Sequence, residues 1–332
     1  MPAGLMIRDR LANEFITDTD ILTLSRDGLA KSGLAVADVT ARAVSPLPGT
    51  FAGVTVRLDG ADPQDRTPPD DPATNPLSAG TPNYNFYSIE VVQRIGYDSY
   101  TPDNGVLLAK NKDSMRGRNG GPNAFNSFIW VIDAHPEDIN QVDYVKPNGE
   151  KVMRTIADYR QLNDALFHAG TRSGSEYEWE DTPNRLHFYV IDVHRNEQGV
   201  LSYTLAVRSL DGSGPQTRGV GLEAPADGTA TQATFTLANT GEAAATGPGL
   251  HPRDVNDYLT SDVYRLSVSV DGEGWSAELL NALAAVKFGA SQPVNVFFTH
   301  EPGASPSATI TLTATSDSDP TKTATATYQV SR

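Results

Sequence analysis

The segment TLTATSDSDPTKTATATYQV (Thr311–Val330) contains two runs in which threonine alternates with alanine or a larger apolar residue. Alternation of this kind puts one class of side chain on each face of a β-strand. A turn rich in serine and aspartate, ending at Pro320, separates the two runs. The segment therefore predicts two antiparallel strands that cover a core on one side only.

Short runs of the same kind occur along the whole chain, and turn residues separate them. After residue 222 their spacing is typical of an immunoglobulin-like β-sandwich, and about 110 residues is the size of one such module. The predicted strands are Phe51–Leu58, Tyr87–Ile95, Gly105–Ala109, Phe128–Ala134, His187–Val193, Leu201–Val207, Ala233–Leu237, Tyr264–Val270, Val294–Phe298, Ala308–Ala314 and Thr323–Val330.

Two of these strands, Phe128–Ala134 and His187–Val193, are apolar at odd and even positions alike. Such strands bury both faces, which favours central over edge positions. The fold class predicted is mostly β: an antiparallel β-sandwich domain over residues 1–222 with one amphipathic helix, then an immunoglobulin-like β-sandwich over residues 223–332. The helix is expected to start at Thr155 and to stop at Gly170. Residues 59–83 and 113–127 are expected to be long loops.

Composition excludes several classes of protein. The 332 residues include 26 Lys and Arg but 41 Asp and Glu, a net charge of −15 that disfavours nucleic acid as a partner. There is no cysteine, so disulfides and thiolate zinc sites are excluded. No apolar stretch approaches the ~18 residues of a membrane span, and MPAGLMIRDR does not have the pattern of a signal peptide.

Two resemblances cover most of the chain. The last part resembles the bacterial immunoglobulin-like modules of secreted hydrolases through TFTLANTG (Thr234–Gly241), the stretch Asp262–Trp275 and the segment Thr311–Val330, with Trp275 as a core residue. The first 222 residues resemble the region that follows the catalytic domain in secreted M6-type zinc metallopeptidases, the immune inhibitor A group. The sequences that carry this second resemblance are Asn85–Ser99, Asp103–Asp113, Phe128–Asp138, Ile156–Gly170 and Arg185–Val193.

The zinc signature of that family, His-Glu-x-x-His on a helix, is missing. Of the six histidines only His300 is followed by Glu, and Pro302 and Gly303 then forbid the helix that this motif needs. The resemblance therefore implies a non-catalytic accessory region that stabilises a protease domain or positions protein substrate. It also implies a secreted protein with an apolar docking surface for an N-terminal protease domain outside this chain. We expect no catalytic residue and no zinc site here.

Calcium is the metal that the sequence favours, because acidic loops offer the oxygen ligands it prefers. The candidate ligands are Asp18, Asp20, Asp59, Asp62, Asp103 and Asn104. A second candidate metal site comes from the repeated pattern Val-Ile-Asp-x-His. On a strand, Asp133 and His135 share one side, as do Asp192 and His194, and the four could converge if the strands were neighbours. The alternative is that both strands simply become polar where they leave the sheet.

Two other functions stay open at this point. One is a stand-alone extracellular binding or adhesion protein of tandem β-sandwich modules. The other is a hydrolase that uses acids such as Glu176, Glu178 and Glu180, although their alternation is typical of a charged solvent face. The sequence does not determine the ligand, the oligomeric state or whether further domains precede it.

Overall fold

A computed structural model of the chain describes residues 5–58, 84–111, 129–138, 141–153 and 163–332. The described residues are mostly β, as predicted, and all eleven predicted strands are present, with ends shifted by a few residues. The predicted loops 59–83 and 113–127 lie outside the described residues, as does the first half of the predicted helix, residues 155–162. No helix in the described part has the length and apolar character that a bilayer crossing needs.

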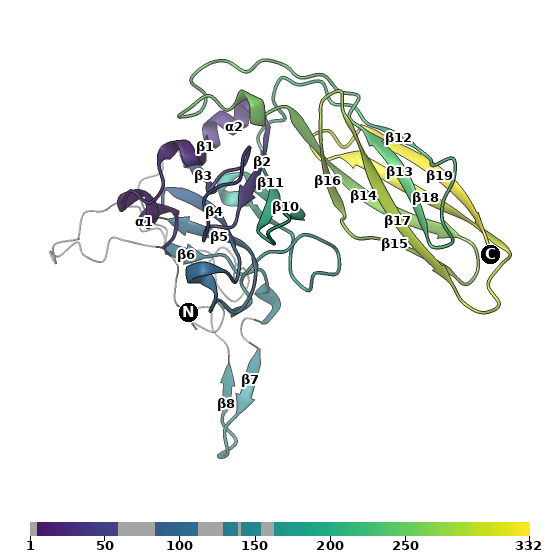
Figure 1. Cartoon of the computed structure of the whole chain (residues 1–332), viewed down its shortest axis with the longest axis horizontal. Helices are drawn as coiled ribbons and strands as arrows, with labels where there is room; N and C mark the ends of the chain where they lie inside the picture. The colour runs from purple at the N-terminus through teal and green to yellow at the C-terminus, as the bar shows by residue number, and fades with distance from the viewer. Residues whose placement is uncertain (1–4, 59–83, 112–128, 139–140, 154–162) are drawn as a thin grey trace.

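The N-terminal half contains two sheets (Figure 1). The first has the order β1-β3-β4-β5-β6, and its β1–β3 pair is parallel, so this half is not purely antiparallel as predicted. The second has the order β2-β11-β10-β9 and is antiparallel. The strands are β1 (Ile21–Ser25), β2 (Leu34–Thr40), β3 (Gly53–Arg57), β4 (Phe86–Val92), β5 (Gly105–Asn111), β6 (Ile129–Val131), β9 (Glu178–Asp181), β10 (Leu186–Arg195) and β11 (Leu201–Ser209).

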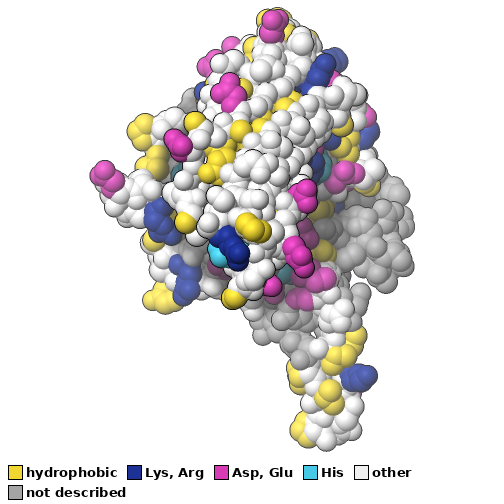
Figure 2. Space-filling model, turned by 90° about the vertical axis from the view of Figure 1, so that its right-hand side faces the viewer, with side chains coloured by type: hydrophobic (Ala, Val, Ile, Leu, Met, Phe, Trp, Pro, Cys, Tyr) yellow, Lys and Arg dark blue, Asp and Glu magenta, His cyan; other side chains and the backbone are white. Residues whose placement is uncertain are grey.

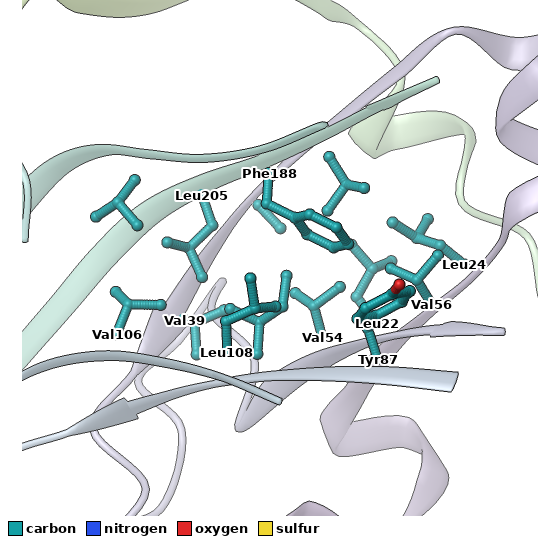
Figure 3. Close-up of a cluster of buried hydrophobic side chains, with 14 of the residues drawn as sticks. Leu22, Leu24, Val39, Val54, Val56, Tyr87, Val106, Leu108, Phe188 and Leu205 are labelled. Carbon is teal, nitrogen blue, oxygen red and sulfur yellow. The ribbon is translucent and has the colours of Figure 1, made fainter. Parts of the chain in front are cut away.

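These two sheets share one hydrophobic core. Figure 3 shows Phe188 and Leu205 of the second sheet pointing toward Val54, Tyr87 and Leu108 of the first. Tyr87 is fully buried, and its hydroxyl donates to the carboxylate of Asp181. Because a buried phenol needs a polar partner, this bond closes the core at the end where β9 pairs with β10.

The C-terminal part also has two antiparallel sheets over a common core, with the orders β12-β13-β17-β15 and β16-β14-β18-β19. Trp275 is 9% exposed and belongs to this core, which confirms its predicted packing role. The strands are β12 (Gly221–Glu223), β13 (Gln232–Ala238), β14 (Ser261–Asp271), β15 (Trp275–Leu279), β16 (Leu283–Lys287), β17 (Ser291–His300), β18 (Ser307–Ser316) and β19 (Thr323–Ser331).

The helices of the described residues are short and lie elsewhere than predicted. They are α1 (Ile7–Ala12) and α2 (Arg26–Ser32). In α2, Ser25 caps the first turn by accepting from Gly28 N, and Gly33 ends the helix with φ +89°. The described end of the predicted helix is not helical: Phe167 instead bonds with Val106 in both directions at the edge of the first sheet. Burial against a sheet satisfies its apolar side chain as well as a helix would.

Strand β10 buries both faces, as predicted, and is central in its sheet. Its even-numbered side chains belong to the core shared with the first sheet, whereas Tyr189 and Ile191 pack on the other side against Val263 and Leu283 of the C-terminal part. The prediction for Phe128–Ala134 is wrong in one respect, because β6 is the outermost strand of its sheet in the described part of the chain.

A charged network surrounds that second apolar cluster. Arg265 of β14 donates through Nη1 and Nη2 to the carboxylate of Glu178, at 3.0 and 2.7 Å, and through Nε to Asp317 Oδ1 at 2.5 Å. Tyr189 Oη donates to Asp317 Oδ2 at 2.5 Å, and Arg208 Nε lies 3.0 Å from the same oxygen. Glu178 thus faces the joint between the two halves rather than a solvent-exposed edge.

A two-stranded hairpin, β7 (Val142–Val145) and β8 (Lys151–Met153), projects from the rest of the molecule (Figures 1 and 2). Four of its apolar side chains are more than two-fifths exposed: Val142, Tyr144, Val145 and Met153. An isolated hairpin is marginally stable in water, and clustered apolar side chains on such an arm are typical of a contact surface.

The charged network yields a stability prediction. Arg265→Ala should lower the free energy of unfolding by about 2 kcal/mol, because it removes the charged hydrogen bonds to Glu178 and Asp317, which keep His187 and Arg208 as neighbours. Urea unfolding followed by tryptophan fluorescence measures the loss. The control Arg172→Ala breaks an ion pair with Glu278 at a side chain that is 78% exposed, so it should cost less than about 1 kcal/mol.

The ion pair between Arg265 and Glu178 also predicts that the stability of the protein depends on pH. Burial opposes ionisation of Glu178, but hydrogen bonds from His187 and Arg265 lower its pKa to about 2 from 4.5. Its contribution to stability is therefore complete above pH 4.5 and is lost as the pH falls toward 2. The difference in unfolding free energy between wild type and Arg265→Ala should therefore decrease as the pH falls from 4.5 toward 2. Equal losses of unfolding free energy in Arg265→Ala and Arg172→Ala would contradict this account of the joint.

Candidate functional site

One group of side chains in the described residues has the spacing of metal ligands: Asp133, His135 and Asp164. Their possible ligand atoms all lie within 4.8 Å of one another. Asp133 and His135 follow β6, where the sheet ends, and Asp133 Oδ1 accepts from the backbone N–H of His135 at 2.9 Å. Asp164 comes from a segment 29 residues further on, in the part predicted to be a helix. No sequence signal linked it to the other two.

The contacts of His135 indicate that its ring is protonated. Nδ1 lies 2.6 Å from the backbone oxygen of Asp164, and Nε2 lies 2.5 Å from that of Gly174. A carbonyl oxygen only accepts, so both ring nitrogens must donate. Burial by itself would lower the pKa of His135, but these two carbonyls raise it above its ordinary value.

Burial also raises the pKa of the Asp133 carboxyl, to about 6. The side chain is 7% exposed, so the charged form loses most of its hydration. The group therefore combines a carboxyl and an imidazole whose pKa values are both raised above the ordinary ones. It connects three segments, 133–135, 164 and 174, that are far apart in the sequence.

As arranged, this group does not fit a resident metal ion well. An imidazole ligates through a nitrogen lone pair, and in this geometry both ring nitrogens are donating. Calcium requires 6–8 oxygen ligands, and the oxygens that face the ring are occupied by the ring. The arrangement suits a proton-dependent clasp between loops. A calcium site in this chain stays a prediction.

The other two residues of the repeated Asp-x-His pattern lie elsewhere. Asp192 Oδ1 accepts from Asn281 Nδ2 at 3.2 Å, across the joint between the two halves. His194 Nε2 lies 3.0 Å from Thr204 Oγ1, and that hydroxyl donates to Asp38. Neither belongs to the group around Asp133. The two strands therefore do not bring the four residues into one ligand group.

The acidic loop candidates have partners within the protein. Asp18 lies 3.7 Å from Arg253 Nη2, and Asp20 accepts from the backbone N–H and the hydroxyl of Thr17. These hydrogen bonds lower the pKa of Asp20 below its ordinary value. Asp59 and Asp62 lie outside the described residues.

Asp103 and Asn104 form one cluster with His168. Nε2 of His168 lies 2.9 Å from Asp103 Oδ2 and 2.7 Å from the backbone oxygen of Asn104. The side-chain oxygen of Asn104 accepts from the backbone N–H of Arg94 at 2.7 Å. These oxygens therefore hold a turn in place, and whether they also bind calcium is still a prediction.

Comparison with known protein families assigns the chain to a family. A family model described as a middle domain matches residues 12–210, which is more than half of the chain. The chain belongs to this middle-domain family. A second model, described as a Peptidase M6-like domain, matches residues 216–332. The M6-like match thus falls on the part for which the sequence predicted an immunoglobulin-like module.

A relative from Arthroderma benhamiae, named "Putative secreted metallopeptidase", is 46% identical over 312 residues. The alignment covers 91% of this chain but 43% of the relative, so the chain spans less than half of that protein's length. The predicted relation to metallopeptidases is confirmed at this level. The immune inhibitor A type and the immunoglobulin-like module stay predictions.

The clasp at Asp133 in the middle domain yields a second prediction. Asp133 binds its proton more tightly in the folded state, with a pKa of about 6 against 3.8, so wild-type stability falls as the pH rises through this window. Asn does not titrate and can still accept the His135 N–H. Relative to wild type, Asp133→Asn should therefore gain up to about 3 kcal/mol in unfolding free energy between pH 4 and 6.

Urea midpoints measured at several pH values test this. The comparison variant is Asp319→Asn. Hydrogen bonds from Thr321 lower the pKa of the exposed Asp319 carboxyl, so the unfolding free energy of this variant relative to wild type should fall, not rise, with increasing pH. A difference between Asp133→Asn and wild type that does not change with pH would show that the carboxyl is not held as described.

Proposed function

We propose that this chain is a non-catalytic accessory region of a secreted zinc metallopeptidase, which stabilises the protease domain or positions protein substrate. One observation supports it above the others: residues 216–332 match a Peptidase M6-like domain, yet the printed sequence contains no His-Glu-x-x-His. A zinc peptidase needs those ligands and that base to activate water. The name of the relative supports an extracellular location.

The two histidines of the M6-like part support this proposal because they make structural contacts. His251 Nδ1 accepts from the backbone N–H of Ser25 at 3.1 Å, and its Nε2 lies 3.1 Å from Ser32 Oγ. His251 therefore ties the M6-like part to both ends of α2 in the middle domain. His300 is exposed near the end of β17, and its ring lies 4.8 Å from that of Trp275.

The β7–β8 hairpin supports a docking role. Its exposed apolar side chains Val142, Tyr144, Val145 and Met153 form a surface that another domain would cover. We propose that the protease domain is that partner. The hairpin also carries charged residues: Lys146 and Glu150 pair with each other at 2.7 Å, and Lys151 of β8 is exposed.

Three finer assignments belong to the same proposal. We infer that residues 216–332 form an immunoglobulin-like β-sandwich, since two four-stranded antiparallel sheets share one core there. The pairing of Gly221 and Leu222 with β13 favours a domain boundary in residues 211–215, slightly before the predicted one after residue 222. A structural calcium would sit among the acidic loops outside the M6-like part.

Hydrolysis of fluorescent casein tests the absence of catalysis. The purified chain with added zinc should release no fluorescence above buffer, and isothermal titration should detect no zinc binding at micromolar concentration. Zinc-dependent turnover that a chelator abolishes would overturn the proposal.

Complementation tests the accessory role. The part of the Arthroderma relative that lies outside the matched 312 residues should be poorly soluble alone and should gain soluble yield when this chain is co-expressed. The double variant Tyr144→Ser/Val145→Ser should lose at least half of that gain, because it removes apolar contact area from the hairpin. The control Leu280→Ser changes a side chain that is 61% exposed elsewhere and should keep the full gain. Equal gains in soluble yield with the double variant and with Leu280→Ser would exclude the hairpin as the docking surface.

A further inference from the structure

A pocket of about 730 Å³ opens beside α1 in the middle domain. None of its lining residues belongs to the hairpin or to the group around Asp133. This volume is in the range of natural ligand sites. Two rim side chains are unusually exposed for large apolar residues: Phe15 at 69% and Tyr97 at 48%. The apolar walls come from the residues on either side of α1, the loop after β2 and the 3₁₀ turn Gly96–Asp98, namely Leu5, Phe15, Ile16, Val44, Pro46 and Tyr97.

A buried cation lines the same pocket. Arg10 is 5% exposed, and its Nη1 is buried with no hydrogen-bond partner in the part of the chain that the structure describes. Its nearest anion is the fully buried Glu90, whose Oε1 lies 3.6 Å from Arg10 Nη1, beyond hydrogen-bond distance. A buried guanidinium that does not complete its hydrogen bonds costs free energy that a bound anion would recover.

The neighbouring charges do not supply that partner. Arg42, which also lines the pocket, uses Nε and Nη2 in a bidentate pair with Asp98 at 2.8 and 2.9 Å. Asp98 is therefore committed to Arg42. Asp20 stands at the pocket wall, but its Oδ2 accepts both the N–H and the hydroxyl of Thr17. Arg10 is the cation in this pocket that still lacks a hydrogen-bonded anion.

We propose that this pocket binds the C-terminal residue of a peptide with an apolar last side chain, with the terminal carboxylate paired to Arg10. Guanidinium and carboxylate form charge-assisted hydrogen bonds, and the aromatic rim supplies contact area for the side chain. A terminal residue carries a backbone N–H next to its carboxylate, so it can present a donor to Asp20 and an acceptor to Arg10 together. A fatty acid offers no such donor.

This inference rests on the proposed handling of protein substrate and names its chemistry. Peptide-bond hydrolysis creates a new terminal carboxylate, so such a pocket would retain the N-terminal product of a cleavage after an apolar residue. The binding measurement below is separate from casein turnover and from complementation. If no peptide binds, the proposed role of the pocket is wrong. The non-catalytic accessory role is still tested by casein turnover and by complementation.

Fluorescence polarisation with N-terminally labelled hexapeptides tests the proposal on the whole chain. A peptide that ends in phenylalanine with a free carboxylate should bind at least tenfold more tightly than the same peptide amidated. An amidated peptide with an internal glutamate beside phenylalanine distinguishes a side-chain carboxylate from a terminal one, and decanoate serves as a competitor without a backbone.

Variants locate the binding. Arg10→Gln should reduce the preference for acid over amide to less than twofold. Because that variant also leaves Glu90 buried without its nearest cation, Ser45→Trp provides an independent test: Ser45 is an exposed pocket residue, and indole would fill the space and abolish binding. The control Tyr100→Ser alters an aromatic side chain that is 83% exposed outside the pocket lining and should bind like wild type.

Three results would overturn the proposal. Equal affinity for the acid and the amide would remove the role of Arg10. Unchanged binding by Ser45→Trp would place the peptide elsewhere. Tighter binding of decanoate than of every peptide would assign the pocket to a fatty acid instead.

Discussion

The arrangement of the molecule depends on the burial of both faces of the sheet that contains β10. One face completes the core of the middle domain, and the other, through Tyr189 and Ile191, packs against Val263 and Leu283 of the M6-like part. A strand that is apolar on both faces needs two covers, and here the second cover comes from the other half of the chain. The two halves therefore form a joint rather than two modules on a flexible linker.

Charge makes that joint specific. The apolar cluster between the halves is small, and apolar contact alone allows sliding. Arg265, Asp317 and Glu178 fix one register, since a bidentate guanidinium pair tolerates little displacement. His251 adds a second fixed point by binding both ends of α2. The accessory role that we propose, with a docking surface and a peptide pocket in constant positions, would benefit from such a rigid joint.

The candidate sites differ in what they offer to a ligand. At Asp133 and His135 the printed partners are groups of the protein itself: His135 N–H donates to Asp133 Oδ1, and the His135 ring contacts the backbone oxygens of Asp164 and Gly174. At the pocket beside α1, Arg10 is buried, its Nη1 has no hydrogen-bond partner in the described residues, and its ion pair with Glu90 is 3.6 Å long. Unsatisfied buried charge next to open space is the stronger indication of a ligand. The hairpin is a third kind of surface, apolar and projecting.

The sequence by itself determined the strands, because alternation and short apolar runs depend only on neighbouring residues. It also determined the lack of a zinc motif and the metallopeptidase relationship. It extended the predicted helix too far, since Leu166 and Phe167 fit a helical stripe but are buried equally well at a sheet edge. Only the tertiary structure decided that Asp133 meets Asp164 and not Asp192, that Glu178 faces Arg265, and that Arg10 lines a pocket. Those pairings join residues tens of positions apart, and local sequence carries no record of which distant segment will pack alongside.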